Sequence, residues 1–171
     1  MANAKNNEEV FTLTREFDAP RDLVFEVWTN PKHFSKWFSP KGFTPKFISQ
    51  DIRVGGITHY CMTSPDGTEV WGKTIYQEIT KPTKLVYLQQ FSNPEGGMGR
   101  HPMSPTWPPQ MLTTIEFEAV GNKTKIVLTW KPVDASKEEM DTFIAAKPGM
   151  SQGWGGTFEN LDAYLEEVRN G

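Results

Sequence analysis

The sequence contains a single cysteine and no long hydrophobic run. Cys61 has no second cysteine to pair with, so an internal disulfide cannot form, and a reducing compartment is expected. No stretch of about 18 apolar residues occurs, and no apolar segment follows a basic N-terminus. We therefore expect neither a membrane span nor a cleaved export signal, and we expect a cytoplasmic protein.

Clusters of charge and of metal ligands are also missing. The net charge is -3 and no basic block occurs, which argues against a nucleic-acid partner because phosphate neutralisation needs clustered Lys and Arg. His33, His59 and His101 fall in separate segments and give no zinc-binding spacing. No Gly-x-Ser-x-Gly elbow and no phosphate-cradling glycine loop is present. We expect no metal and no cofactor.

The chain is instead rich in amphipathic segments, of which 149–168 is the most regular. Its large apolar residues recur every three or four positions, which predicts a long C-terminal helix with one apolar face; they are Met150, Trp154, Phe158, Leu161, Leu165 and Val168. Gly153, Gly155 and Gly156 beside Trp154 indicate either close packing on a strand or a helix end that borders a cavity. Ser136 and Glu139 form a capping-box pattern for a preceding helix, which we expect to end at 147–149, Lys-Pro-Gly.

Alternating apolar and polar residues predict a first strand at 10–17, followed by two short helices near 20–28 and 31–38. Six further strands are predicted at 43–52, 57–63, 68–79, 85–91, 111–119 and 123–130. Their connections are too short for crossover helices, so the predicted fold is α+β with a mainly antiparallel sheet of six to seven strands. We expect residues 1–9 to be a disordered tail and 10–171 a single domain. Segment 92–110, dense in Gly and Pro, is either a lid, a binding loop or disordered.

His59 is the most notable titratable residue of the predicted strands. It shares a strand face with Cys61, whereas Thr58, Tyr60 and Met62 share the other. His59 is either a surface or hydrogen-bonded strand residue or a polar anchor inside a cavity. Chemistry at the Cys61 thiol is a further alternative.

Four segments together resemble the AHSA-like subfamily of the SRPBCC superfamily, named for homology to the activator of the Hsp90 ATPase. They are FEVWTNPKHFSKWFSPKG at 25–42, RVGG with SPDG at 53–67, YQEITKPTKLV at 76–86, and GWGGT at 153–157 with Leu161 and Leu165. The resemblance runs from about residue 10 to residue 168. It implies the helix-grip fold, also found in START domains and pathogenesis-related allergens, in which a curved antiparallel sheet wraps the C-terminal helix and leaves a cavity.

In that fold the aromatic-rich elements adjoin the gap between helix and sheet. The candidate ligand-binding residues are Trp28, Trp37, Phe38, Phe47, Tyr60, Trp71, Phe91, Thr113, Trp130, Trp154, Phe158 and Leu161, with Thr58 and Gln89 as further polar groups. They predict a site for a small hydrophobic or aromatic ligand. One alternative is a cyclase- or hydrolase-like enzyme on a hydrophobic substrate, with His59 or Tyr60 as proton donor. Another is a chaperone-binding module, although the chaperone-activating eukaryotic relatives carry an additional N-terminal domain and only nine residues precede the first predicted strand here.

Overall fold

The computed structural model describes residues 9–102 and 104–170, and its strands and helices follow the predicted order. The expected disordered tail therefore lies, except for Glu9, outside the described residues. The elements are β1 (Phe11–Phe17), α2 (Arg21–Thr29), α3 (Pro31–Trp37), β2 (Thr44–Gln50), β3 (Ile57–Thr63), β4 (Glu69–Thr80), β5 (Lys84–Phe91), β6 (Gln110–Val120), β7 (Lys123–Pro132) and α4 (Lys137–Asn170).

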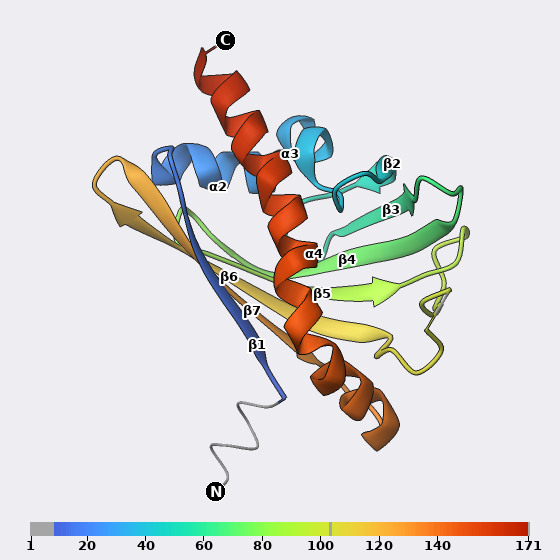
Figure 1. Ribbon diagram of the computed structural model, residues 1–171. Coiled ribbons are helices and arrows are strands. Elements are labelled where there is room, and N and C mark those ends of the chain that lie inside the picture. Colours follow the sequence, from blue (N-terminus) through green and yellow to red (C-terminus); the bar gives the residue numbers. More distant parts are fainter. Residues whose placement is uncertain (1–8, 103, 171) are drawn as a thin grey trace, which may run out of the picture.

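The seven strands form one sheet in the order β1-β7-β6-β5-β4-β3-β2, and every neighbouring pair is antiparallel. Each strand from β2 to β7 pairs with the next one along the chain. Strand β1 pairs with β7 and forms the edge of the sheet opposite β2. The sheet curves around α4, which crosses one of its faces (Figure 1). The predicted α+β helix-grip architecture is confirmed.

The predicted break before the C-terminal helix is wrong, because α4 runs without interruption over 34 residues with Pro148 inside it. The first turns of α4 lie at an angle to the rest of the helix (Figure 1). Proline removes one intrahelical hydrogen bond and costs roughly 3 kcal/mol in a helix interior. Phe143 and Met150, on either side of it, are both buried, and the Phe143 ring lies 6.2 Å from that of Trp130 on β7. This packing holds both parts of the helix in place and offsets the cost. The capping box at the start is confirmed: Ser136 Oγ accepts from the Glu139 N–H (3.1 Å), and Glu139 Oε1 accepts from the Ser136 N–H (2.9 Å).

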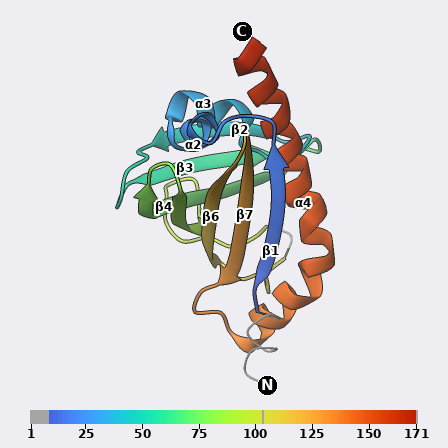
Figure 2. The same ribbon diagram turned by 90° about the vertical axis from the view of Figure 1, so that its left-hand side faces the viewer.

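The two short helices cover one end of the sheet, beside α4 (Figure 2). Helix α2 contacts β6 and β7, and α3 contacts α4 and β2. Trp28 of α2 is completely buried, with its ring centroid 4.7 Å from that of Trp37 in α3. Phe158 and Leu161 of α4 are also completely buried. This end of the molecule is therefore filled by its own side chains.

None of the helices in the described part of the chain has an apolar stretch long enough to cross a membrane.

Candidate functional site

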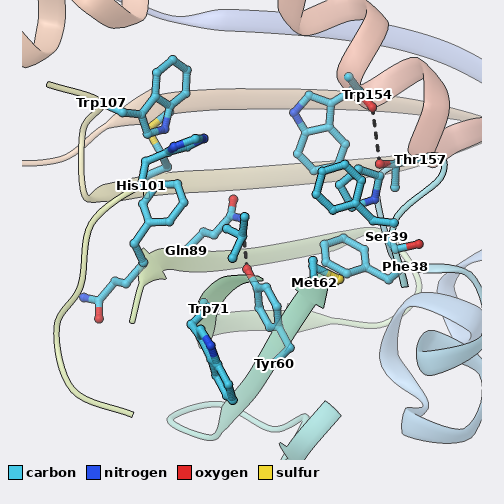
Figure 3. A pocket seen from close by; sticks show the side chains of 18 of the residues that line it. Phe38, Ser39, Tyr60, Met62, Trp71, Gln89, His101, Trp107, Trp154 and Thr157 are labelled. Carbon is cyan, nitrogen blue, oxygen red and sulfur yellow. Dashed lines mark hydrogen bonds between the residues drawn. The ribbon is translucent and has the colours of Figure 1, made fainter. Parts of the chain in front are cut away.

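A pocket of about 410 Å³ lies between the middle of α4 and the face of the sheet that α4 covers (Figure 3). Its walls come from strands β3 to β7, from α4, from the connection between α3 and β2, and from the loop between β5 and β6. The lining residues are Phe38, Ser39, Pro40, Phe43, Tyr60, Met62, Val70, Trp71, Gly72, Gln89, Gln90, Phe91, His101, Trp107, Met111, Trp130, Met150, Gly153, Trp154 and Thr157. Most are apolar, which is typical of sites for small molecules.

Three tryptophans form an apolar wall of the pocket. The ring centroid of Trp130 on β7 lies 5.9 Å from that of Trp154 on α4 and 6.1 Å from that of Trp107 in the β5–β6 loop. The planes of Trp130 and Trp154 are nearly perpendicular, at 89°. Such edge-to-face contacts fix the rings while leaving large flat surfaces. This wall therefore suits a flat, apolar molecule.

Side-chain interactions attach the β5–β6 loop, 92–109, to β4 and to α4. Lys73 Nζ on β4 donates to the carbonyl of Gly96 (3.0 Å). Arg100 of the loop forms an ion pair of 2.8 Å with Glu139 in the first turn of α4. Because the loop also contributes His101 and Trp107 to the lining, it forms part of the pocket wall.

Tyr60 supplies the pocket with a buried phenol. Its hydroxyl accepts a hydrogen bond of 3.1 Å from Gln89 Nε2 on β5, drawn as a dashed line in Figure 3. Burial raises the pKa of Tyr60, so the phenol keeps its proton at neutral pH. Its ring lies over Gly72 of β4, where a Cβ would stand 2.7 Å from Tyr60 Cζ. A glycine at the paired position is therefore what allows the ring to lie there.

Two polar atoms of the lining are buried and have no hydrogen-bond partner among the described residues. They are Gln89 Oε1, an acceptor, and Trp130 Nε1, a donor. A buried polar atom without a partner costs roughly 1–3 kcal/mol. Both atoms therefore have hydrogen-bonding capacity that the described protein residues leave unused.

The lining carries little charge. Among the described residues that line the pocket, none is Asp, Glu, Lys or Arg. Burial lowers the pKa of His101, which favours the neutral imidazole at pH 7, and its ring packs 5.4 Å from that of Phe91. Within the described part of the chain, no group of three or more His, Cys, Asp or Glu residues could hold a metal ion.

The structure brings six of the twelve candidate residues to this pocket: Phe38, Tyr60, Trp71, Phe91, Trp130 and Trp154. The other six do not line it, and they are Trp28, Trp37, Phe47, Thr113, Phe158 and Leu161. All of these except Phe47 are buried elsewhere in the interior, on α2, α3, β6 and α4. Of the two further polar groups, Gln89 lines the pocket, whereas Thr58 is bonded to the Tyr76 hydroxyl at 2.8 Å.

His59 does not lie inside the pocket, contrary to the interpretation as a cavity anchor. Tyr60 points toward the pocket, so His59 and Cys61, its neighbours in the strand, point to the opposite face. The His59 ring stacks near that of Trp71 (5.5 Å), and its Nε2 lies 3.2 Å from the carbonyl oxygen of Asn93. Trp71, which pairs with Cys61 across the two strands, lines the pocket as well as contacting His59. Cys61 is buried and burial raises the pKa of its thiol, which disfavours the reactive thiolate.

Several lining residues were not among the candidates, and some of them have a recognisable sequence signal. Gly72 is a glycine inside a strand pattern, which indicates a bulge or a close approach. Met150 belongs to the predicted apolar stripe of α4, one helical turn before Trp154, and Gly153 is one of the glycines noted beside that tryptophan. Trp107 and His101 lie in the irregular loop, where no periodicity indicates which side chains point inward.

A family model described as Activator of Hsp90 ATPase homolog 1-like protein matches residues 18–166. The chain belongs to this family. The match spans nearly the whole chain and confirms the resemblance found in the sequence motifs. No curated protein matches the sequence.

Solved structures of bacterial proteins share the fold of this family member. The protein Ms6760 from Mycobacterium smegmatis has a TM-score of 0.76 at 21% identity, over 93% of this chain and 91% of that one. A protein from Arthrobacter aurescens has a TM-score of 0.76 at 27% identity, over 94% and 88% of the two chains. An AHSA1 protein from Silicibacter pomeroyi has a TM-score of 0.70 at 14% identity, over 93% and 99%. These similarities establish the fold, and a shared fold does not determine function.

Proposed function

We propose that this protein binds a small, mainly apolar molecule in the pocket between α4 and the sheet. The volume of about 410 Å³ falls within the range of roughly 300–1,000 Å³ that is usual for small-molecule sites. The aromatic wall of Trp107, Trp130 and Trp154 supports a flat apolar occupant. The single cysteine and the sequence composition favour the cytoplasm as its location.

The observation that carries the proposal is the glycine on the helix wall. Gly153 lines the pocket, and a Cβ added there would have no protein atom within 4 Å other than its immediate surroundings in the helix. Glycine in a helix interior is less favourable than alanine by roughly 1 kcal/mol. A side chain at position 153 would extend into the pocket, so this glycine keeps that space free for a bound molecule.

The experiment uses N-phenylnaphthylamine, an uncharged dye whose fluorescence rises in apolar surroundings. The wild-type protein should bind the dye, and its melting temperature should rise with dye concentration because only the folded state offers the site. Gly153→Leu should reduce dye affinity about tenfold or more by extending into the pocket. Gly155→Leu is the matched control: its Cβ also has nothing within 4 Å, and it does not line the pocket.

Native mass spectrometry of the purified protein complements the dye measurement by detecting a molecule that co-purifies. Absence of dye binding by the wild-type protein, or equal loss in both leucine variants, contradicts the proposal. The family's name makes stimulation of Hsp90 ATP hydrolysis the measurement that would then be made next.

The second candidate function is an enzymatic role on a hydrophobic substrate. Tyr60 is then a better candidate than His59 for the proton donor, because Tyr60 lines the pocket and His59 does not. The Tyr60 phenol is buried in the pocket and its raised pKa keeps it protonated. Turnover that is lost in Tyr60→Phe, while dye binding persists, would establish this role. Turnover that persists in Tyr60→Phe would exclude Tyr60 as the donor.

A further inference from the structure

The two lining residues with unpartnered polar atoms, Gln89 and Trp130, lie on the strands on either side of β6. Gln89 of β5 pairs with Met111, and Trp130 of β7 pairs with Thr113, two residues further along β6. Met111 and Thr113 lie on the same face of the strand because side chains alternate. Gln89 and Trp130 therefore present their side chains on one face of the sheet, two strands apart. Neighbouring strands are about 4.8 Å apart, so the two positions are separated by roughly 10 Å across the sheet.

These two residues offer opposite hydrogen-bonding groups. Gln89 commits its Nε2 to the Tyr60 hydroxyl and keeps Oε1 as an unused acceptor. The indole Nε1 of Trp130 can only donate, and it too is unused among the described residues. A molecule that satisfies both must carry a donor toward β5 and an acceptor toward β7. A purely hydrocarbon ligand would leave both atoms unpaired.

The composition of the lining disfavours a charged ligand. No Asp, Glu, Lys or Arg occurs among the described lining residues, so an ion would enter an apolar pocket without a countercharge. Burying an unpaired charge is far more costly than burying a hydrogen-bonded neutral group. The pocket should therefore discriminate strongly between a hydroxyl and a carboxylate on the same ring system.

We infer that the ligand is an uncharged, flat molecule of about two fused rings that bears hydroxyl or carbonyl groups at its opposite ends, recognised by Gln89 Oε1 and Trp130 Nε1. The inference rests on the proposed function, because it specifies the occupant of the same pocket. Tyr60 acts as a positioning residue, since its hydroxyl fixes the amide of Gln89.

The test compares three naphthalenes with the same 2,6-substitution pattern by calorimetry or dye displacement. In 2,6-dihydroxynaphthalene both ends can donate and accept, in 2,6-dimethoxynaphthalene both ends only accept, and naphthalene-2,6-dicarboxylate carries two charges. The dihydroxy compound should bind about fivefold more tightly than the dimethoxy compound, since one hydrogen bond to Gln89 distinguishes them. The dicarboxylate should bind at least a hundredfold more weakly than the dihydroxy compound.

Two strand glutamines, one in the pocket lining and one outside it, provide matched variants. Gln89→Met should abolish the preference for the dihydroxy over the dimethoxy compound. Gln77→Met should retain it, because Gln77 is an exposed residue of β4 that does not line the pocket. Trp130→Phe removes the donor and should weaken both neutral compounds. The wild-type ligand series does not depend on any variant folding.

The outcomes separate this inference from the proposed function. Equal affinity for the two neutral compounds, or tight binding of the dicarboxylate, overturns the inference while the pocket still stands as a binding site. Failure of both neutral compounds and of N-phenylnaphthylamine to bind overturns the inference and the proposed function together. Preference for the dihydroxy compound that persists in Gln89→Met shows that Gln89 does not recognise the ligand, and overturns the assignment.

Discussion

Tyr60 of β3 lies directly over Gly72 of β4, the residue with which it pairs across the two strands. A methyl group at position 72 would stand 2.7 Å from both Cζ and Oη of the tyrosine. Gly72→Ala should therefore displace the ring and break its hydrogen bond with Gln89. We expect a loss of about 1–3 kcal/mol in the free energy of unfolding, as is usual for overpacked interiors, and weaker dye binding. Urea denaturation and dye titration measure the two effects.

A double-mutant cycle checks that the tyrosine causes this effect. In a Tyr60→Leu background, the shorter side chain leaves room for the methyl group, so Gly72→Ala should cost much less than in the wild type. A coupling of about 1 kcal/mol or more between the two positions is expected for residues in contact. Additive effects would show that Gly72 acts through something other than Tyr60.

Gly155 and Gly156 are neighbours in α4 whose replacement by alanine should have opposite effects on stability. At Gly155 nothing lies within 4 Å of an added Cβ, so Gly155→Ala should stabilise the protein by about 0.5–1 kcal/mol through helix propensity. At Gly156 an added Cβ would lie 2.9 Å from Lys41 Cβ, in the connection between α3 and β2. Gly156→Ala should therefore destabilise by about 1–2 kcal/mol. Denaturation curves that show stabilisation in both variants would contradict the close approach at Gly156.

The fold was predictable from sequence to a large extent because its signals are local. The alternation in Ile57–Thr63 and the stripe from Met150 to Leu165 depend only on neighbouring residues. The break expected at Pro148 was wrong for a non-local reason. Phe143, packed against Trp107 and Trp130, anchors the helix before the proline, and Met150 anchors it after. Tertiary packing outweighed the local preference of the proline.

The sequence predicted the apolar character of the site but not which residues line it. An abundance of aromatic residues indicated an apolar pocket, but their distribution between pocket and core depends on where α2 and α3 cover the sheet. Trp28 and Trp154 illustrate this, because both lie on apolar helix faces and only Trp154 reaches the pocket. His59 and Tyr60 show the same limit in a strand. Alternation places them on opposite faces, and the sequence does not say which face α4 covers.

Trp28 and Trp154 should therefore respond differently to truncation. Trp28 is completely buried and is not part of the pocket lining, so Trp28→Ala should cost about 3–5 kcal/mol of stability. Trp154 is only partly buried, so Trp154→Ala should cost less than half as much and should change the affinity for N-phenylnaphthylamine. Chemical denaturation and dye titration of both variants provide the comparison. An effect of Trp154→Ala on stability alone would assign Trp154 to the core.

Stability should fall as the pH drops from 7 to 5 because of His101. Burial lowers the pKa of His101 below its ordinary value of 6.5, so the folded state binds the proton less readily than the unfolded chain does. As the pH falls through 6.5, the unfolded state takes up the proton first, and the free energy of unfolding decreases. The decrease ends once the pH is below the pKa of His101 in the folded state. Urea denaturation at several pH values between 5 and 8 measures this slope.

The carboxyl groups with shifted pKa values affect stability in a lower pH range than His101 does. Their contribution to the free energy of unfolding can therefore be separated from that of His101. The pKa of Glu139 is lowered from its ordinary 4.5, mainly by the hydrogen bond from the backbone N–H of Ser136, and that of Glu159 is lowered from 4.5 by Lys41. Their stabilising contributions are present above pH 4.5 and are lost only below it. His101→Gln should therefore flatten the slope between pH 5 and 7 and leave the acid limb below pH 4.5 in place. An unchanged slope in His101→Gln would assign the dependence to another group.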